Sequence, residues 1–166
     1  MGSTYVVRPA LLRDIQFVLA RLSPVAHASM EAEIGDGDCL EKVKESVSGS
    51  RPFGMSVVYT LESGIEQPLA IFGMMPTIVP ADNRRIAQLW CIASTAVALP
   101  HHAASFSRKT KRYIESLLDS YDLLFTVEDA ANLEGLRWLE FLGFSEKKRG
   151  PFGPLGREFV EMSRVA

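Results

Sequence analysis

Four basic residues stand close together near the middle of the chain, where we expect a helix to begin. They are Arg108, Lys109, Lys111 and Arg112. Cations in the first turns of a helix oppose the positive end of the helix dipole, at about 0.3–1 kcal/mol each. A bound polyanion would remove this cost, because backbone N–H groups and cations would both face phosphate oxygens. The pattern therefore favours a phosphate site, with Ser105 and Ser107 as capping hydroxyls. The alternative is a solvated basic face balanced by Glu115 and Asp119.

A second pattern runs from Asn132 to Phe144. Asn132 suits a helix N-cap, apolar residues recur at helical spacing as far as Leu142, and Gly143 suits the position that follows a helix. Taken alone, this segment is an ordinary amphipathic helix with capped ends.

Other side chains could transfer a proton or receive a substrate. His101 and His102 could titrate near neutrality, bind phosphate or act as a base, whereas the simpler interpretation is a pair of exposed loop histidines. Cys91 lies in an apolar segment, where a thiol is usually inert. Glu31 and Glu33 could receive a cationic substrate or could be solvated charges. Neither the cysteines nor the histidines have metal-ligand spacing, so we expect no metal.

Apolar periodicity predicts the elements that must position these residues. Strands are expected over residues 5–8, 53–61, 68–75, 85–94, 121–127, from 144 and over 157–162, and helices over 11–22, 38–49, from about 106, and over 133–142. Residues 25–37 are less clear, with a possible short helix and a turn at Gly35–Gly37. The succession of strand, loop, helix and strand over 89–127 indicates a βαβ crossover and therefore a parallel pair. We predict an α+β (α/β-like) fold with helices on both faces of one mixed sheet.

Composition narrows the classes of function. The chain has 166 residues, and 18 Lys and Arg against 20 Asp and Glu give a formal charge of −2. Bulk attraction to nucleic acid or to an anionic membrane is therefore not expected. No apolar run approaches the roughly 18 residues that cross a bilayer, and the N-terminus has no secretion signal. The two cysteines are far apart and are expected to be reduced thiols. We expect one cytoplasmic domain over residues 1–166.

The two helix patterns together, in this order, resemble the GNAT superfamily of acetyl-CoA-dependent N-acetyltransferases. Residues Asn132–Phe144 keep the spacing of its last block, an Asn followed by a helix that ends in Leu-Gly-Phe. The opening Val7–Ala10, followed by Asp14, is similar to its first strand and helix. Within the superfamily, the chain is most similar to a divergent branch encoded by tailed bacteriophages, through Leu89-Trp90, Phe106–Arg108 and Arg137–Leu139.

This resemblance implies a mostly antiparallel sheet whose central parallel strands splay apart and hold acetyl-CoA in a V-shaped opening. The amides of the pantetheine arm would pair with the splayed strand, the pyrophosphate would lie at the helix start with two cations nearby, and Asn132 would reach the pantetheine arm. The expected cofactor-binding residues are Cys91, Ala93, Thr95, Ser105, Phe106, Ser107, Arg108, Lys109 and Asn132.

Two departures from the family pattern bear on catalysis. The loop Leu99–Ala104 contains no glycine, and Leu139 stands where many of these enzymes carry the tyrosine that protonates the leaving thiolate. No catalytic acid or base is identified from the sequence. The first functional hypothesis is an N-acetyltransferase that acts on a primary amine of a protein or a small molecule. The second is a catalytically degenerate phage protein of the same fold, in the host-cell cytoplasm, that binds a host or virion protein.

Overall fold

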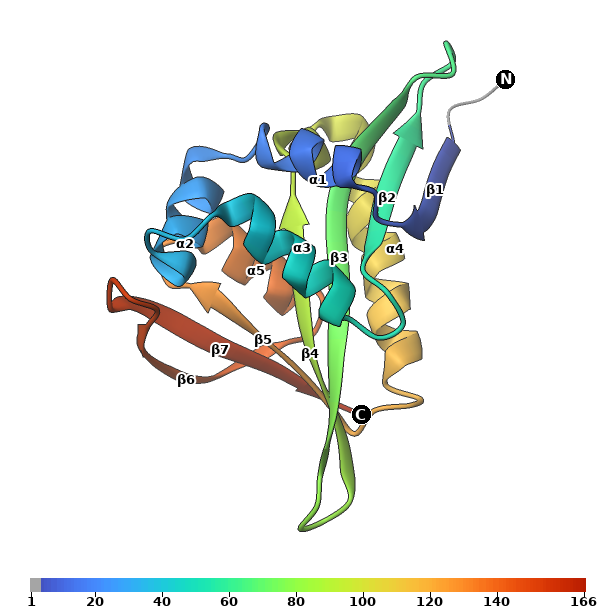
Figure 1. The fold of residues 1–166 in the computed structure, drawn as a ribbon. Coiled ribbons are helices and arrows are strands. Elements are labelled where there is room, and N and C mark those ends of the chain that lie inside the picture. The colour runs from blue at the N-terminus through green and yellow to red at the C-terminus, as the bar shows by residue number, and fades with distance from the viewer. Residues whose placement is uncertain (1–3) are drawn as a thin grey trace.

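A seven-stranded sheet with the strand order β1-β2-β3-β4-β5-β7-β6 forms the centre of the molecule (Figure 1). The computed structural model describes residues 4–166. The strands are β1 (Thr4–Pro9), β2 (Met55–Thr60), β3 (Glu66–Val79), β4 (Arg84–Ala93), β5 (Leu123–Asp129), β6 (Ser145–Phe152) and β7 (Arg157–Val165). The helices are α1 (Leu12–Leu19), α2 (Pro24–Ile34), α3 (Cys39–Gly49), α4 (Pro100–Leu117) and α5 (Leu133–Phe141), with a 3₁₀ turn, η1 (Thr95–Ala98), before α4.

The pairing of β4 with β5 is the parallel junction of the described sheet, and every other pair of neighbouring strands is antiparallel. The chain passes from β4 to β5 through η1 and α4, as the βαβ spacing predicts. The predicted α+β fold, a mostly antiparallel mixed sheet with helices on both faces, is therefore confirmed.

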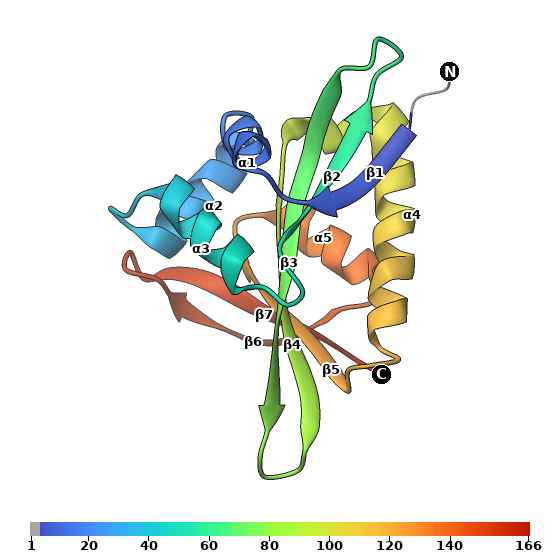
Figure 2. The same cartoon turned by 45° about the vertical axis from the view of Figure 1, so that its right-hand side comes forward.

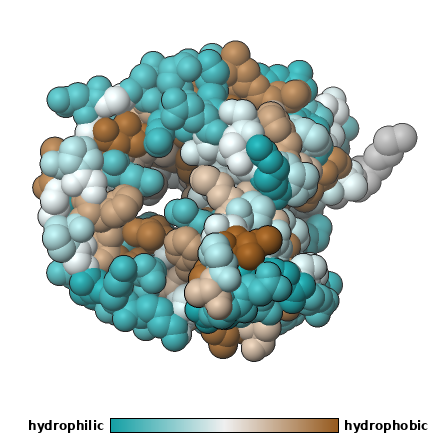
Figure 3. Space-filling view, turned by 60° about the horizontal axis from the view of Figure 1, so that its bottom comes forward, coloured by the Kyte–Doolittle hydropathy of each residue, from teal (hydrophilic) through white to brown (hydrophobic). Residues whose placement is uncertain are grey.

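The helices bury the two faces of the sheet separately (Figure 2). On one face, apolar residues of α1 and α3, such as Val18 and Val47, pack with Ile71 of β3. On the other face, Ile114 of α4 and Leu139 of α5 belong to a cluster that includes strand residues of β5 and β7. In the described residues, no helix has the length and apolar character that crossing a membrane requires. A space-filling view shows a hollow in the face turned toward the viewer, with hydrophobic side chains around it (Figure 3).

Several boundaries differ from the prediction by a few residues. The possible short helix within residues 25–37 is confirmed as α2, which ends before a turn at Gly35. Strand β3 continues past Met75 to Val79, where it forms a long hairpin with β4 (Figure 1). Helix α4 begins at Pro100, because proline at the first helical position has a suitable φ and lacks only an N–H that would be unpaired there. The prediction that this helix begins near residue 106 is therefore wrong.

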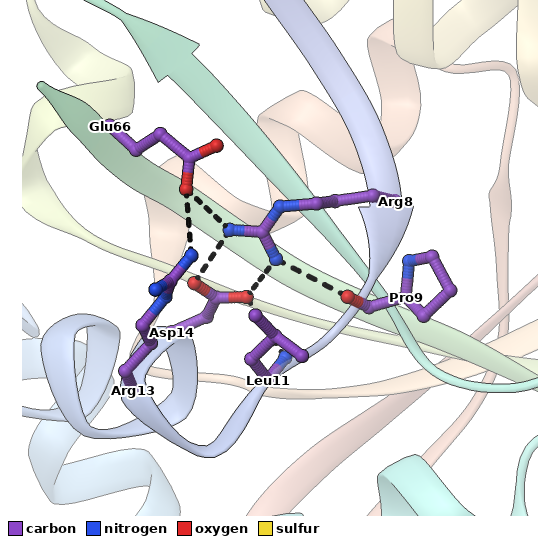
Figure 4. A network of polar contacts seen from close by, with 6 residues as sticks. All are labelled: Arg8, Pro9, Leu11, Arg13, Asp14 and Glu66. Carbon is purple, nitrogen blue, oxygen red and sulfur yellow. Dashed lines mark hydrogen bonds and ion pairs between the residues drawn. The ribbon is translucent and has the colours of Figure 1, made fainter. Parts of the chain in front are cut away.

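A buried ion pair joins β1 to α1 (Figure 4). The guanidinium of Arg8 donates to both carboxylate oxygens of Asp14, at 2.6 and 3.1 Å, and Asp14 is fully buried. The same carboxylate accepts the backbone N–H of Leu11 at 2.9 Å, which satisfies a donor at the start of α1. Glu66 of β3 accepts hydrogen bonds from Arg8 and Arg13, so the network also reaches the sheet.

We expect Asp14→Ala to lower the free energy of unfolding by about 2–4 kcal/mol, because it leaves the half-buried Arg8 cation and the Leu11 N–H without their partner. The control Arg13→Ala removes a mostly exposed ion pair and should cost less than about 1 kcal/mol. Urea denaturation of the two variants measures both values. Equal losses would contradict the assignment of Asp14 as the anchor of this network.

Candidate functional site

The parallel strands β4 and β5 separate soon after they meet. Their register consists of Ile86–Gln88 opposite Leu123–Phe125, and no further pair joins them in the described residues. Each strand keeps its outer partner beyond that point: β4 pairs with β3 as far as Ala93, and β5 pairs with β7 as far as Asp129. The inner edges therefore diverge, and each presents unpaired backbone groups to the gap.

A cleft of about 450 Å³ lies in this gap. Its walls come from β4, β5, η1, and the facing parts of α2, α4 and α5. Six of the residues expected to bind the cofactor line it: Cys91, Ala93, Thr95, Phe106, Ser107 and Asn132. An exposed strand edge beside such a cleft can hydrogen-bond to the amides of an extended ligand.

The other three expected residues do not line this cleft. Ser105 hydrogen-bonds with the side chain of Tyr5, and Arg108 is exposed. The Lys109 ammonium lies 4.5 Å from the centre of the Tyr5 ring. Because α4 begins at Pro100, these cations lie in its third turn and not in its first two, and neither Ser105 nor Ser107 caps it. The predicted crowding of cations at the helix start is therefore wrong, and their role toward phosphate stays a prediction.

His102 is buried in the first turn of α4, so the interpretation that it is an exposed loop histidine is wrong. Its Nδ1 atom lies 2.7 Å from the Tyr5 hydroxyl. Burial and the neighbouring His101 lower the pKa of His102. The side chain holds the first turn of α4 against β1 and is not a group of the cleft.

Glu128, at the end of β5, is the titratable group of the cleft that the sequence analysis missed. Burial raises its pKa to about 7, and the nearby carboxylates Asp129 and Glu33 act in the same direction. The Asn132 side chain donates to Glu128 Oε1 at 3.0 Å and accepts the Gly135 N–H at 3.1 Å. A carboxyl group with a pKa near 7 can exchange protons at neutral pH, which suits a general base. The sequence does contain a signal that could have identified Glu128, because it is a carboxylate at the carboxyl end of a central strand.

Asp129, the next residue, is held in a structural ion pair. The carboxylate accepts from Arg157 at 2.6 Å, from the Ser29 hydroxyl at 2.8 Å and from the Ala131 N–H at 2.9 Å, and the side chain is buried. These contacts join β5 to β7 and to α2, so they place α2 as one wall of the cleft.

The ionisable lining of the cleft is acidic. It comprises Glu33, Glu128, Asp129 and Glu134, and none of the described residues that line it is Lys or Arg. Burial raises the pKa of Glu33, which faces the cleft, whereas Glu31 lies outside it and pairs with His27 at 3.5 Å. Such a lining favours a cationic ligand on the α2 side.

Cys91 is exposed to the cleft, so the interpretation that it lies in the core is wrong. Enclosure by the cleft walls and the charge of Glu128 raise the pKa of its thiol to about 12. The group is therefore a neutral thiol at pH 7 and not a nucleophilic thiolate.

Leu139 of α5 is buried in the core, and its side chain has no proton to donate. In residues 4–166, no group of three or more His, Cys, Asp or Glu side chains is placed to hold a metal ion.

No protein-family model and no curated protein matches the sequence. The fold, however, is similar to those of solved acetyltransferases. An aminoglycoside N(6′)-acetyltransferase from Legionella pneumophila superposes with a TM-score of 0.69 at 10% identity, over 99% of this chain and 94% of that one. An acetyltransferase of the GNAT family from Streptococcus pneumoniae gives a TM-score of 0.60 at 13% identity, over 98% and 99% of the two chains.

A chain of the NatC complex, whose structure was solved with Gag peptide and CoA, gives a TM-score of 0.67 at 12% identity, over 98% of both chains. The similarity covers nearly the whole length of each protein, and identity is low throughout. The chain has the fold of the GNAT N-acetyltransferases.

Proposed function

We propose that this protein is a GNAT-type N-acetyltransferase that moves an acetyl group from acetyl-CoA to a primary amine. The observation that carries the proposal is Glu128, a carboxyl group whose pKa is raised to about 7, in an acidic cleft between two splayed strands. The GNAT fold of the chain supports the same activity.

The donor side of the cleft suits an extended chain of amides. The free inner edge of β4 at Cys91–Ala93 offers backbone groups for the pantetheine arm. The small residues Thr95, Ala98 and Ala103 line the end of the cleft next to the start of α4, where phosphates could approach the helix N-terminus. Because the Asn132 side chain is engaged by Glu128 and Gly135, we assign it to the positioning of Glu128.

The acceptor amine arrives as an ammonium ion, which the acidic lining attracts. Glu128, as carboxylate, takes one proton and leaves a neutral amine. The amine nitrogen then attacks the thioester carbonyl, so a C–N bond forms and the C–S bond breaks. The thiolate of CoA leaves and takes up the second proton that the nitrogen loses. The substrate nitrogen therefore supplies the proton that the CoA thiolate receives. In many enzymes of the family a tyrosine supplies it, but Leu139 stands at that position here and has no such proton.

The alternative hypothesis, a degenerate phage protein that binds a host or virion protein, has one supporting observation. The Phe106 and Trp138 rings stack at 5.8 Å, and the Trp138 Nε1–H donates to Ser107 at 3.2 Å. The stack joins α4 to α5 in the wall of the cleft, where the two rings fill space that a donor could otherwise use. Binding of the donor discriminates between the two hypotheses.

We expect calorimetry to detect acetyl-CoA binding with a dissociation constant of about 1–100 µM. Ala103→Glu, which places a bulky anion in the cleft beside the expected phosphates, should weaken binding at least about tenfold. Ala104→Glu is the matched control, because its side chain is exposed and lies outside the cleft, and it should change affinity less than about threefold. Absence of binding to the wild-type protein would favour the degenerate phage protein.

Glu128→Gln should lower kcat by about 10²–10⁴-fold toward a panel of primary amines, because the base is lost. The wild-type kcat/KM should rise with pH through about 7, where Glu128 loses its proton, and the variant should lack this rise. Release of the CoA thiol measures both. The control Glu31→Gln, outside the cleft, should change kcat less than about twofold. An unchanged pH profile in Glu128→Gln would remove this residue from the mechanism.

A further inference from the structure

Helix α4 covers the face of the sheet opposite α1 and α3 (Figure 2). A second cavity, of about 340 Å³, lies between α4 and the sheet. Apolar side chains of the strands form one wall (Val57, Phe72 and Leu89), and side chains of α4 and α5 form the other (Phe106, Ile114 and Leu139). Tyr113 of α4 meets Phe72 edge to face at 5.5 Å, so α4 contacts the sheet there while space remains alongside.

The space is partly open to solvent, but its lining is almost entirely apolar. Side chains normally pack against one another at the density of an organic crystal, and here they leave apolar surface exposed beside the core. An apolar ligand that covered this surface would remove it from water, which is favourable. The space is therefore suited to an apolar ligand.

The apolar cavity adjoins the cleft. Three side chains line both spaces and form the wall that they share beside the inner edge of β4: Cys91 and the stacked rings of Phe106 and Trp138. The hydrogen bond from Trp138 to Ser107 fixes one ring of that stack. A thioester held at Cys91 would therefore place its acyl chain next to the apolar cavity.

Polar groups mark the side of the cavity next to β1. The Lys109 ammonium lies over the Tyr5 ring, and the Tyr5 hydroxyl contacts His102. An aliphatic chain that reached these groups would gain little from burial, so its useful length is limited. At about 30 Å³ for each carbon group, close to the volume of a water molecule, the cavity has room for roughly eleven carbons at most.

We propose that this cavity binds the hydrocarbon chain of a medium-chain acyl-CoA, so that the protein accepts acyl groups longer than acetyl. The proposal rests on the proposed function, because the chain reaches the cavity only from a thioester held in the cleft. The bonds formed and broken in the transfer are those already given for the acetyl group.

The test is a titration of the protein with acetyl-, butanoyl-, hexanoyl-, octanoyl- and dodecanoyl-CoA, measured by calorimetry and by the intrinsic fluorescence of Trp90 and Trp138, which both line the cavity. Burial of each methylene strengthens binding by up to about fourfold. We expect octanoyl-CoA to bind at least about tenfold more tightly than acetyl-CoA, with one site per chain, and the gain to stop by dodecanoyl-CoA.

Thr110→Phe fills the cavity from α4, and Ser116→Phe places the same side chain on the exposed face of that helix. The first variant should bind octanoyl-CoA no more tightly than acetyl-CoA while its affinity for acetyl-CoA changes less than about threefold. The second should keep the wild-type chain-length series.

Equal or falling affinity from acetyl- to octanoyl-CoA in the wild-type protein would overturn the chain-binding proposal and leave the acetyltransferase proposal standing. Binding that keeps strengthening to dodecanoyl-CoA at several molecules per chain would also overturn it, as non-specific partition. Failure of every thioester to bind would overturn both proposals.

Discussion

The separation of β4 from β5 is the constraint on which the rest of the structure depends. Each strand stays paired on its outer side, β4 with β3 and β5 with β7, whereas no pair joins the two strands beyond Gln88 and Phe125 in the described residues. An open backbone edge inside a domain leaves polar groups without partners unless a ligand or water supplies them. The cleft is therefore a place where binding an extended amide chain replaces hydrogen bonds that the fold leaves unmade.

The acidic residues of the cleft differ in whether a cation pairs with them. The Arg157–Asp129 pair neutralises one carboxylate while it holds α2 in place, and Glu128 and Glu33 remain as unpaired acids in restricted solvent. Burial, together with the negative charges of Asp129 and Glu33, raises the pKa of Glu128 to about 7. In the proposed transferase, the same arrangement would attract an ammonium group and remove its proton, so one electrostatic feature would serve both binding and activation of an amine.

Local pattern was sufficient for the order of the elements, the parallel pair and the N-cap at Asn132, because each depends on residues close in sequence. Prediction failed where distant contacts decide the outcome. The burial of His102 depends on Tyr5 of β1, and the pKa of Glu128 depends on walls contributed by α2 and α5. The start of α4 was misplaced for a local reason: Pro100 was interpreted as a loop residue, although proline is favoured at the first position of a helix.

Amide hydrogen exchange with and without acetyl-CoA tests the central claim most directly, since the claim concerns backbone groups at the open edge of β4. The account predicts slower exchange at residues 91–93 and at the start of α4 when acetyl-CoA is added, with unchanged exchange in the antiparallel strands β1 and β2. Exchange at residues 91–93 that does not respond to saturating acetyl-CoA would contradict it.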